Sequence, residues 1–409
     1  MDFLYSGVDE WIKIYERDTD MKIAMLGHKR IPSREGGVEV VVEELAGRMV
    51  EQGHQVVVYN RKGHHVSGAE NDEYAYKKGF EYKGIQVKTV FTLPNKSLNA
   101  IVYSFFATLK AGISKADVIH FHAEGPCAML PIAKLFRKKC VATIHGLDWQ
   151  RAKWGGFATK FLLFGERMAA KKADEVIVLS KAVQEYFKKT YNRDTVLIPN
   201  GIEKPEYRET KEITIRYNLK EDGYVLFLAR LVPEKGIHTL LEAYEDSNLN
   251  VPLVIAGGGS HASEYETEIR KIAERINRNE ACRIAGRQVI LTGFIQGRIL
   301  EELYSNALFY VLPSEIEGMP LSLLEAMSYG NICLTSDIEE NISVTGEYGF
   351  SFETKNADAL REELNRLASE AKELKSGGKF SREAIQQYIL EKYNWNDVVK
   401  RTLECYERL

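Results

Sequence analysis

Two stretches of this chain follow one pattern: "IAMLGHKRIPSREGGVEVVVEEL" at residues 23–45 and "VLFLARLVPEKGIHTLLEAY" at residues 225–244. Each begins with a short apolar run typical of a buried strand, passes through a basic loop to a glycine, and ends in helical spacing of apolar residues. A helix N-terminus beside basic side chains is therefore expected at the carboxyl edge of each sheet, where open α/β sheets bind ligands. The repetition predicts two α/β domains whose edges face each other across a cleft.

Further apolar runs of strand length lie on either side of these stretches, separated by helical or loop segments. This alternation predicts parallel sheets with both faces covered. The polar segment 202–212 is typical of a linker and divides the chain into domains at 21–203 and 204–385, preceded by an arm at 1–20 and followed by an amphipathic helix within 386–409. The other predicted strands are 55–60, 116–122, 140–145, 174–180 and 195–200 in the first domain, and 251–259, 289–295, 307–314 and 331–338 in the second.

Length and composition narrow the class of protein. A chain of 409 residues suggests two or three domains at roughly 150 residues each. The net charge of -3 gives no indication of a nucleic-acid partner. Five scattered cysteines, none in a C-x-x-C pair, indicate reduced thiols rather than a disulfide frame or a zinc site. No stretch approaches the roughly 20 apolar residues of a membrane span, and residues 1–20 lack the apolar core of a signal peptide. We expect a cytoplasmic protein.

The segment "EIEGMPLSLLEAMSYG" at residues 315–330 carries two glutamates eight residues apart, Glu317 and Glu325. Pro320 suits the first turn of a helix and Gly330 the position just after its end, so a helix is predicted at about 320–329. Gly318 would let a ligand approach the free N–H groups of that helix. The plain alternative is an amphipathic helix with two solvated acids.

Two cations in the second repeated stretch indicate what such a ligand could be. Arg230 ends the predicted strand, and Lys235 lies just before Gly236 and the following helix. A guanidinium, an ammonium and a helix N-terminus together suit a diphosphate, although two surface cations would look the same in sequence. Carboxylates beside a diphosphate cannot attract it, so we expect the glutamates to accept hydrogen bonds from sugar hydroxyls. Neither stretch contains G-x-G-x-x-G, and no dinucleotide cofactor is predicted.

Several of these motifs, in this order, resemble one enzyme family. The set "GGVEVVVEEL", "IHGLDW", "LIPNG", "ARLVPEKG", "AGGG" and "EGMPLSLLEAM" is similar to the retaining glycosyltransferases of family 4, over about residues 21–409. The tracts "HKRIPSREGG" and "HGLDWQRAKWG" look closest to the branch that assembles bacterial surface polysaccharides, including rhamnosyl- and glucosyltransferases. The resemblance implies the GT-B fold, in which two Rossmann-like domains face each other across a cleft and the C-terminal helix returns to the first domain.

The resemblance also implies roles for individual residues. Gly36 and Gly37 would let backbone N–H groups approach the donor phosphate, and Arg230 and Lys235 would neutralise the leaving diphosphate. The backbone that caps the phosphate would be that of Gly318, Met319 and Leu321.

The remaining roles concern the two sugars of the donor. Glu325 would bind the ribose hydroxyls, Glu317 would contact the transferred sugar, and His145 would lie near that sugar. The family often has a second glycine where this chain has Pro320, and since proline has no N–H, one phosphate-capping donor is missing there.

The histidines and one acidic motif are the candidates for a metal site. His120 and His122 lie two apart on a predicted strand and would point to one face, so with His145 they form a candidate zinc site. No carboxylate ligand follows, and the more common arrangement, histidines packed and hydrogen-bonded at a sheet edge, fits His120 well. The D-x-D motif that holds a metal in other transferases occurs only at residues 18–20, before the first strand. We therefore expect a transferase without metal or cofactor.

The stretch "WQRAKWGGFATKFLLFGERMAAKK" at residues 149–172 mixes six Lys or Arg residues with five aromatic residues and a single Glu. Such a segment suits an anionic bilayer or a lipid-diphosphate acceptor, but a helix whose aromatic side belongs to the core would fit equally. Peripheral attachment at the inner face of the plasma membrane therefore stays open beside a purely cytoplasmic location.

These observations predict an enzyme that moves a hexose or deoxyhexose from a nucleotide sugar to a lipid-linked glycan, with retention of anomeric configuration. A UDP-sugar is favoured, with dTDP-rhamnose or GDP-mannose as alternatives. Two other functions stay open: a GT-B sugar-nucleotide epimerase, and a noncatalytic protein that binds nucleotide sugars. The base, the sugar, the acceptor and any role of the arm 1–20 are not fixed by the sequence.

Overall fold

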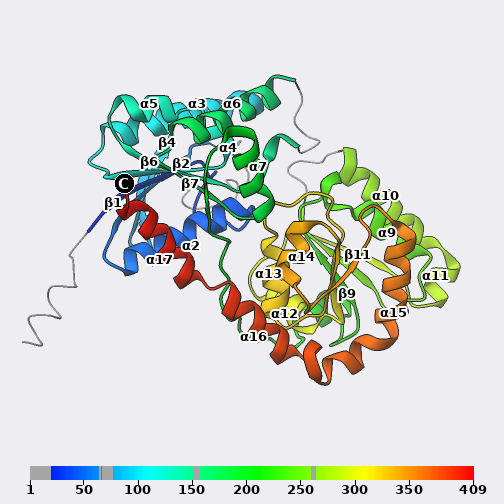
Figure 1. The fold of residues 1–409 in the computed structure, drawn as a ribbon. Helices are drawn as coiled ribbons and strands as arrows, with labels where there is room; N and C mark the ends of the chain where they lie inside the picture. Colours follow the sequence, from blue (N-terminus) through cyan, green and yellow to red (C-terminus); the bar gives the residue numbers. More distant parts are fainter. Residues whose placement is uncertain (1–19, 64–65, 67–76, 151–155, 259–263) are drawn as a thin grey trace, which may run out of the picture.

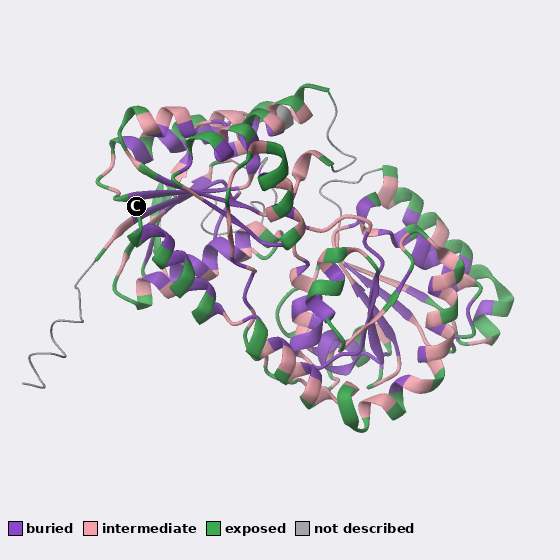
Figure 2. Ribbon diagram, viewed as in Figure 1, coloured by how far each residue is buried: buried purple, intermediate pink, exposed green. Residues whose placement is uncertain are grey.

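The computed structural model describes residues 20–63, 66, 77–150, 156–258 and 264–409 (Figure 1). The arm predicted at 1–20, apart from Asp20, lies outside the described residues, and so do two residues of the D-x-D motif. Two α/β domains are present, each with a mainly parallel sheet between layers of helices. The central strands of each sheet are buried from both sides (Figure 2). The two α/β domains are those expected from the repeated strand–loop–helix pattern, and they agree with the GT-B fold that the resemblance implies.

The first sheet has the strand order β3-β4-β2-β1-β5-β6-β7-β8, in which only β3 is antiparallel to its neighbour. All strands predicted for this half are present. The strand pair β3–β4 was not predicted. Its strands have one face exposed, and their alternating pattern was missed because the prediction was based on continuous apolar runs. The strands are β1 Lys22–Leu26, β2 Gln55–Arg61, β3 Gly79–Tyr82, β4 Ile85–Val90, β5 Val118–His122, β6 Lys139–Ile144, β7 Glu175–Val178 and β8 Val196–Leu197.

The second sheet is parallel throughout, with the order β11-β10-β9-β12-β13-β14. The predicted strands are again present, and the unpredicted β14 is only three residues long. Strand β9 ends at Leu228, so Arg230 lies in the following loop rather than at the strand end as predicted. The strands are β9 Val225–Leu228, β10 Leu253–Ala256, β11 Val289–Gly293, β12 Phe309–Leu312, β13 Cys333–Ser336 and β14 Phe350–Phe352.

Helices cover both faces of each sheet. In the first domain, α2 and α17 pack on one face, and α3, α5 and α6 pack on the other. The helices of this domain are α2 Gly37–Glu51, α3 Lys96–Ile113, α4 Glu124–Cys127, α5 Leu130–Leu135, α6 Gly156–Lys172 and α7 Lys181–Tyr191. Those of the second are α8 Glu212–Tyr217, α9 Ile237–Glu245, α10 Glu264–Arg278, α11 Glu280–Ile284, α12 Arg298–Asn306, α13 Leu321–Ser328, α14 Glu339–Thr345, α15 Ala357–Lys375 and α16 Arg382–Lys392. Among the described residues, none of these helices is long and apolar enough to cross a membrane.

The strand order positions the two basic loops. Strand β1 lies between β2 and β5, and β9 lies between β10 and β12. In the first sheet, α2 follows β1 and α5 follows β5, and these helices pack on opposite faces, which opens a crevice for a ligand at the carboxyl ends of the two strands. The loops that follow β1 and β9 therefore start at the switch point of each sheet.

The chain passes between the domains twice at one place. Ile202, leaving the first domain, forms a β-bridge with Asn394, and its N–H donates to the carbonyl of Tyr393 at 2.7 Å. The chain then continues as α17 (Trp395–Glu407), which packs on α2 of the first domain. Trp395 and Tyr406 share a hydrophobic cluster with Ile23 of β1. The predicted return of the C-terminal helix is confirmed.

A buried hydrogen bond joins this last helix to the central sheet. The Tyr406 hydroxyl lies 2.6 Å from Nδ1 of His120 on β5, and Thr143 Oγ1 lies 2.7 Å from Nε2 of the same ring. His120 is fully buried, and burial lowers the pKa of its ring to about 3, so the ring is neutral near pH 7. Both ring nitrogens are therefore satisfied by side chains that hold β5, β6 and α17 together.

We predict that Tyr406→Phe lowers the free energy of unfolding of the first domain by about 1–3 kcal/mol, because it leaves a buried imidazole nitrogen without a partner. Urea unfolding followed by circular dichroism measures the change. Tyr207→Phe is the control, since Tyr207 is 44% exposed and its hydroxyl donates to Glu221 at 3.0 Å and to Asn306 at 3.2 Å, within reach of water. Equal effects of the two substitutions would contradict the role given to the Tyr406 hydroxyl.

Candidate active site

The loop after β1 is held by Asn60, the next-to-last residue of β2. Its side-chain oxygen accepts the Ile31 N–H at 3.0 Å, and its amide donates to the Ile31 carbonyl at 2.8 Å. The same oxygen lies 3.0 Å from Nε2 of His28, whose pKa burial lowers to about 4. Glu39, in the first turn of α2, accepts the Lys29 N–H at 2.8 Å. These contacts fix the path of the loop up to the start of α2.

At the start of α2, Gly36 is the N-cap residue and Gly37 the first helical residue, and no side chain caps the helix. A Cβ at Gly36 would lie 2.3 Å from Oε2 of Glu39, so a side chain there would displace the carboxylate that accepts the Lys29 N–H. A Cβ at Gly37 would lie 3.2 Å from Cδ1 of Leu321, at the start of α13 in the other domain. The two predicted donor-binding glycines therefore lie where the domains meet, with a helix N-terminus that no side chain caps.

The loop after β9 brings Lys235 to Glu317. Nζ of Lys235 lies 2.5 Å from Oε1 of Glu317, which also accepts the Ser314 hydroxyl at 2.7 Å. The two side chains are only 14% and 7% exposed, so this pair is largely removed from water. Gly236, with φ 65°, begins α9, and a Cβ there would lie 2.1 Å from the carbonyl oxygen of Pro313. The cation and the carboxylate predicted for different roles thus lie side by side.

The second glutamate, Glu325, lies on α13 near the same edge. Helix α13 begins at Leu321, with Pro320 as its N-cap residue rather than within the first turn as predicted. The predicted end is confirmed, since Gly330, with φ 73°, follows Tyr329. Tyr304 donates to Oε2 of Glu325 at 3.0 Å. Burial raises the pKa of Glu325, while the Tyr304 hydrogen bond and the charge of Arg34 oppose that rise.

The domains touch most closely at Gly318. A Cβ added there would lie 1.7 Å from the carbonyl oxygen of His145, and one added at Gly146 would lie 2.9 Å from Cα of Gly318. Next to this contact, the Asn200 N–H lies 2.9 Å from the sulfur of Met319. The segment that carries the two glutamates therefore contacts the first domain at His145, directly after β6.

The structure brings the predicted site residues into one region where the two domains meet. His145 follows β6, and its Nε2 lies 3.1 Å from Nδ1 of His122. Arg230 lies near Lys29 of the first domain, whose pKa its charge helps to lower after the larger effect of burial. Sequence reasoning missed three residues of this region, Arg34, Tyr304 and Asn200. Arg34 and Asn200 lie within the tracts "HKRIPSREGG" and "LIPNG", but nothing in those tracts singles them out, and Tyr304 lies in no motif. The relevance of all three comes from contacts made only in the folded chain.

The zinc alternative does not fit the histidines. Both ring nitrogens of His120 are engaged by Tyr406 and Thr143, so only His122 and His145 are left of the proposed three ligands. Burial is the largest effect that holds the pKa of His122 well below its usual range, and the neighbouring histidines add to it. Among the described residues, no group of three or more His, Cys, Asp or Glu side chains is placed to hold a metal ion.

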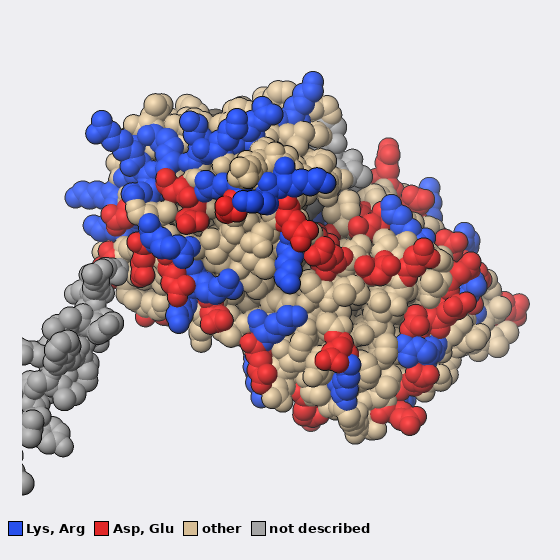
Figure 3. All heavy atoms as spheres, viewed as in Figure 1, with Lys and Arg blue, Asp and Glu red and all other residues tan. Residues whose placement is uncertain are grey.

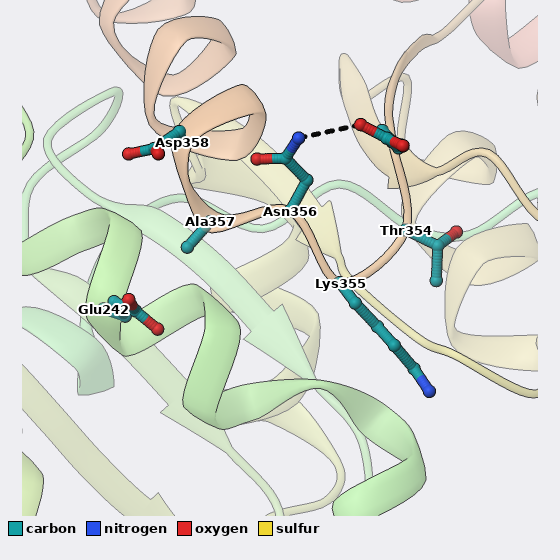
Figure 4. A pocket seen from close by; sticks show the side chains of 7 residues that line it. Glu242, Thr354, Lys355, Asn356, Ala357 and Asp358 are labelled. Carbon is teal, nitrogen blue, oxygen red and sulfur yellow. Dashed lines mark hydrogen bonds between the residues drawn. The ribbon is translucent and has the colours of Figure 1, made fainter.

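A separate polar hollow lies at the edge of the second domain (Figure 4). Glu242 of α9 and residues 353–358, before and at the start of α15, line it. Asn356 donates to Glu353 at 2.7 Å within it. None of the predicted site residues lines this hollow, and we assign it no function.

Comparison with known proteins agrees with this architecture. Residues 35–204 match the domain described as Glycosyltransferase Family 4, and residues 209–384 match Glycosyl transferases group 1. An uncharacterized glycosyltransferase of Methanocaldococcus jannaschii is 25% identical, over 95% of this chain and 98% of its own. A putative teichuronic acid biosynthesis glycosyltransferase of Bacillus subtilis is 26% identical, over 73% of this chain and 74% of its own.

Among solved structures, the Anabaena protein HepE in complex with UDP-glucose superposes with a TM-score of 0.75 at 17% identity, over 95% of this chain and 100% of its own. At that identity the likeness concerns the fold alone. The two matched domains cover most of the chain, and the strand order, the facing loops and the returning helix are those of the GT-B fold. The chain belongs to the family 4 glycosyltransferases.

Proposed function

We propose that this enzyme transfers a hexose or deoxyhexose from a nucleotide sugar to a glycan acceptor in the assembly of cell-surface polysaccharide, with retention of anomeric configuration. The observation that carries the proposal is the meeting of Lys235, Glu317 and the N-terminus of α9 with His145 of the first domain. Teichuronic acid biosynthesis, named for the Bacillus subtilis relative, supports the polysaccharide role. The UDP-glucose bound to HepE supports a UDP-sugar as donor.

In the proposed donor complex, the diphosphate lies against Arg230, Lys235 and the N-terminus of α9. The Lys235 ammonium has three donor hydrogens, so it can keep its bond to Glu317 while it donates to a phosphate oxygen. Gly36 and Gly37 let backbone N–H groups approach from the first domain, and the backbone of Gly318, Met319 and Leu321 caps the phosphate from the second. The positive charge and the helix dipole stabilise the diphosphate as it leaves.

The glutamates hold the two sugars of the donor in this proposal. Glu325 accepts hydrogen bonds from the ribose hydroxyls, with Tyr304 keeping its carboxyl oriented. Glu317, fixed by Lys235 and Ser314, accepts from a hydroxyl of the transferred sugar. Because Glu317 and its partner Lys235 are largely buried and already hydrogen-bonded, the carboxylate needs little rearrangement when the donor binds. His145 contacts the same sugar from the first domain.

Retention is proposed to proceed on one face of the sugar. The bond from the anomeric carbon to the diphosphate oxygen breaks, and the acceptor hydroxyl forms its new bond to that carbon from the same side. The hydroxyl proton passes to the leaving phosphate, so no protein nucleophile is required. An epimerase would bring water instead of an acceptor, and a noncatalytic binding protein would hold the donor without turnover. Product analysis separates the three functions: only the proposed transferase yields a glycosylated acceptor.

We expect purified protein to be stabilised against heat by one class of nucleotide sugar in a panel of UDP-, GDP- and dTDP-sugars, because ligand that binds only the folded state shifts unfolding upward. With that donor and a lipid-linked saccharide, NMR of the product should show the anomeric configuration of the donor. Inverted product would refute retention, and stabilisation without any transfer product would favour the binding-protein alternative.

We predict that Lys235→Ala lowers kcat/KM about 10²- to 10³-fold, a loss typical of removing one charged contact to a leaving group. Lys220→Ala, an exposed lysine of the same domain, is the control and should leave turnover unchanged. Loss of Lys235 also leaves Glu317 without its cation. The double variant Lys235→Ala/Glu317→Gln removes that orphaned charge, and recovery of activity in it would assign the loss to the ion pair rather than to the diphosphate.

Turnover is expected to survive EDTA, because the charge on the departing diphosphate is assigned to Arg230, Lys235 and the dipole of α9 rather than to a divalent ion. Initial rates before and after chelation measure this. Full loss of activity that manganese or magnesium restores would show that the phosphate chemistry is assigned wrongly.

A further inference from the structure

Helix α3 is turned with its larger apolar side chains toward solvent. The side that packs on the sheet carries small or polar residues beside one tyrosine: Tyr103, Ser104, Ala107, Thr108 and Ala111, all buried. The outer side carries Leu98, Phe105, Phe106 and Ile113, which are 43%, 39%, 39% and 74% exposed. Phe106 packs edge-to-face on both Phe105 and the 56% exposed Phe91. Ordinary surface helices have the opposite arrangement, so this face requires a partner.

The neighbouring helices α5 and α6 extend the apolar surface and add positive charge. On α6, Phe157, Lys160, Phe164, Arg167 and Lys171 are exposed at spacings of three and four residues, which places them on one face. Leu135, at the end of α5, is 82% exposed. In contrast, Trp149 donates its indole N–H to Glu166 at 2.9 Å and so points inward. Arg151, Lys153 and Trp154, which belong to the stretch predicted to bind membrane, lie outside the described residues.

The segment that contains α3, α5 and α6 is strongly positive. Residues 96–172 contain 13 Lys or Arg and four Asp or Glu, in a chain whose net charge is -3. Two of the four acids, Glu124 and Glu166, are fully buried beneath the helices. Figure 3 shows Lys and Arg gathered over this domain, whereas acidic side chains are spread over the other.

We propose that the outward side chains of α3, α5 and α6 form a docking surface for an anionic lipid bilayer. Exposed aromatic and aliphatic side chains interleaved with cations match the depth profile of a bilayer, where apolar groups reach the acyl boundary and cations meet the headgroups. A second copy of the same surface fits poorly, because it would bring cations against cations. The proposal rests on the glycan-transfer function above and specifies a membrane-borne acceptor.

The position of α3 agrees with that use. Its residue Asn99 accepts from Arg61 at 3.4 Å and donates to the Leu93 carbonyl at 2.9 Å. Arg61 is the last residue of β2, so α3 begins at the carboxyl edge of the first sheet, the edge that also carries the loop after β1. A bilayer against α3 would therefore hold a lipid-linked saccharide beside the proposed acceptor side of the enzyme.

The test is sedimentation of the full-length protein with vesicles of phosphatidylcholine alone and of phosphatidylcholine mixed with phosphatidylglycerol. Wild type should partition to the mixed vesicles, and Phe105→Gln/Phe106→Gln should lower the partition coefficient on the order of tenfold or more, judged from the transfer of two aromatic side chains. Ile215→Gln/Ile284→Gln is the matched control, because these residues are 75% and 81% exposed on the second domain. It should sediment like wild type.

Charge is tested separately from apolar contact. Lys160→Gln/Lys171→Gln/Lys172→Gln should weaken capture at low salt, and added salt should lower capture of wild type toward that of this variant. Donor-induced thermal stabilisation, measured on every variant, should stay at the wild-type value. Absence of donor-induced stabilisation in wild type would count against the proposed function. Normal stabilisation of wild type without vesicle capture would count against the docking surface alone. Equal capture of wild type and Phe105→Gln/Phe106→Gln, or a wild-type dimer that this variant dissociates, would overturn the proposal.

Discussion

The backbone of Gly318 lies so close to the carbonyl of His145 that no side chain fits between them, and the candidate site depends on this contact. It is the point at which the segment carrying Glu317 and Glu325 reaches the first domain. A β-carbon at this position would push the domains apart and carry both glutamates away from His145 and the N-terminus of α2. Glycine at residue 146, with φ 142°, meets the same requirement from the other side.

Around this contact, the polar groups are held by one another before any ligand is bound. Glu317 is fixed by Lys235 and Ser314, Glu325 by Tyr304, and the loop after β1 by Asn60. A largely buried ion pair contributes little net stability, because removing two charges from water costs about as much as their attraction returns. The Lys235–Glu317 pair instead fixes the positions of both side chains, so they need not be ordered when a donor binds.

Much of the fold could be predicted from the sequence because most strands are continuous apolar runs bounded by turn residues. The β3–β4 pair was missed because strands with one exposed face alternate, and β14 because three residues give no period. At the site, glycines and charged residues next to strand ends were visible as motifs. The role of Tyr304 was not visible, because its contact with Glu325 forms only when α12 and α13 pack together. Arg34 and Asn200 lie within quoted tracts, but their contacts with the second domain depend on how the two domains meet. Helical spacing in residues 149–172 likewise could not show that Trp149 turns inward to Glu166 while Phe157 and Phe164 turn outward.

The return of α17 to the first domain has a consequence for how the protein is made. Trp395, Val399 and Tyr406 belong to the same core as β1 and α2, so the first domain cannot complete its core until residues 395–406 have left the ribosome. The second domain lies wholly between these segments and can fold first. During translation, the part of the sheet face that α17 covers must therefore stay exposed beside α2, and exposed apolar surface of this kind makes a nascent chain prone to aggregation.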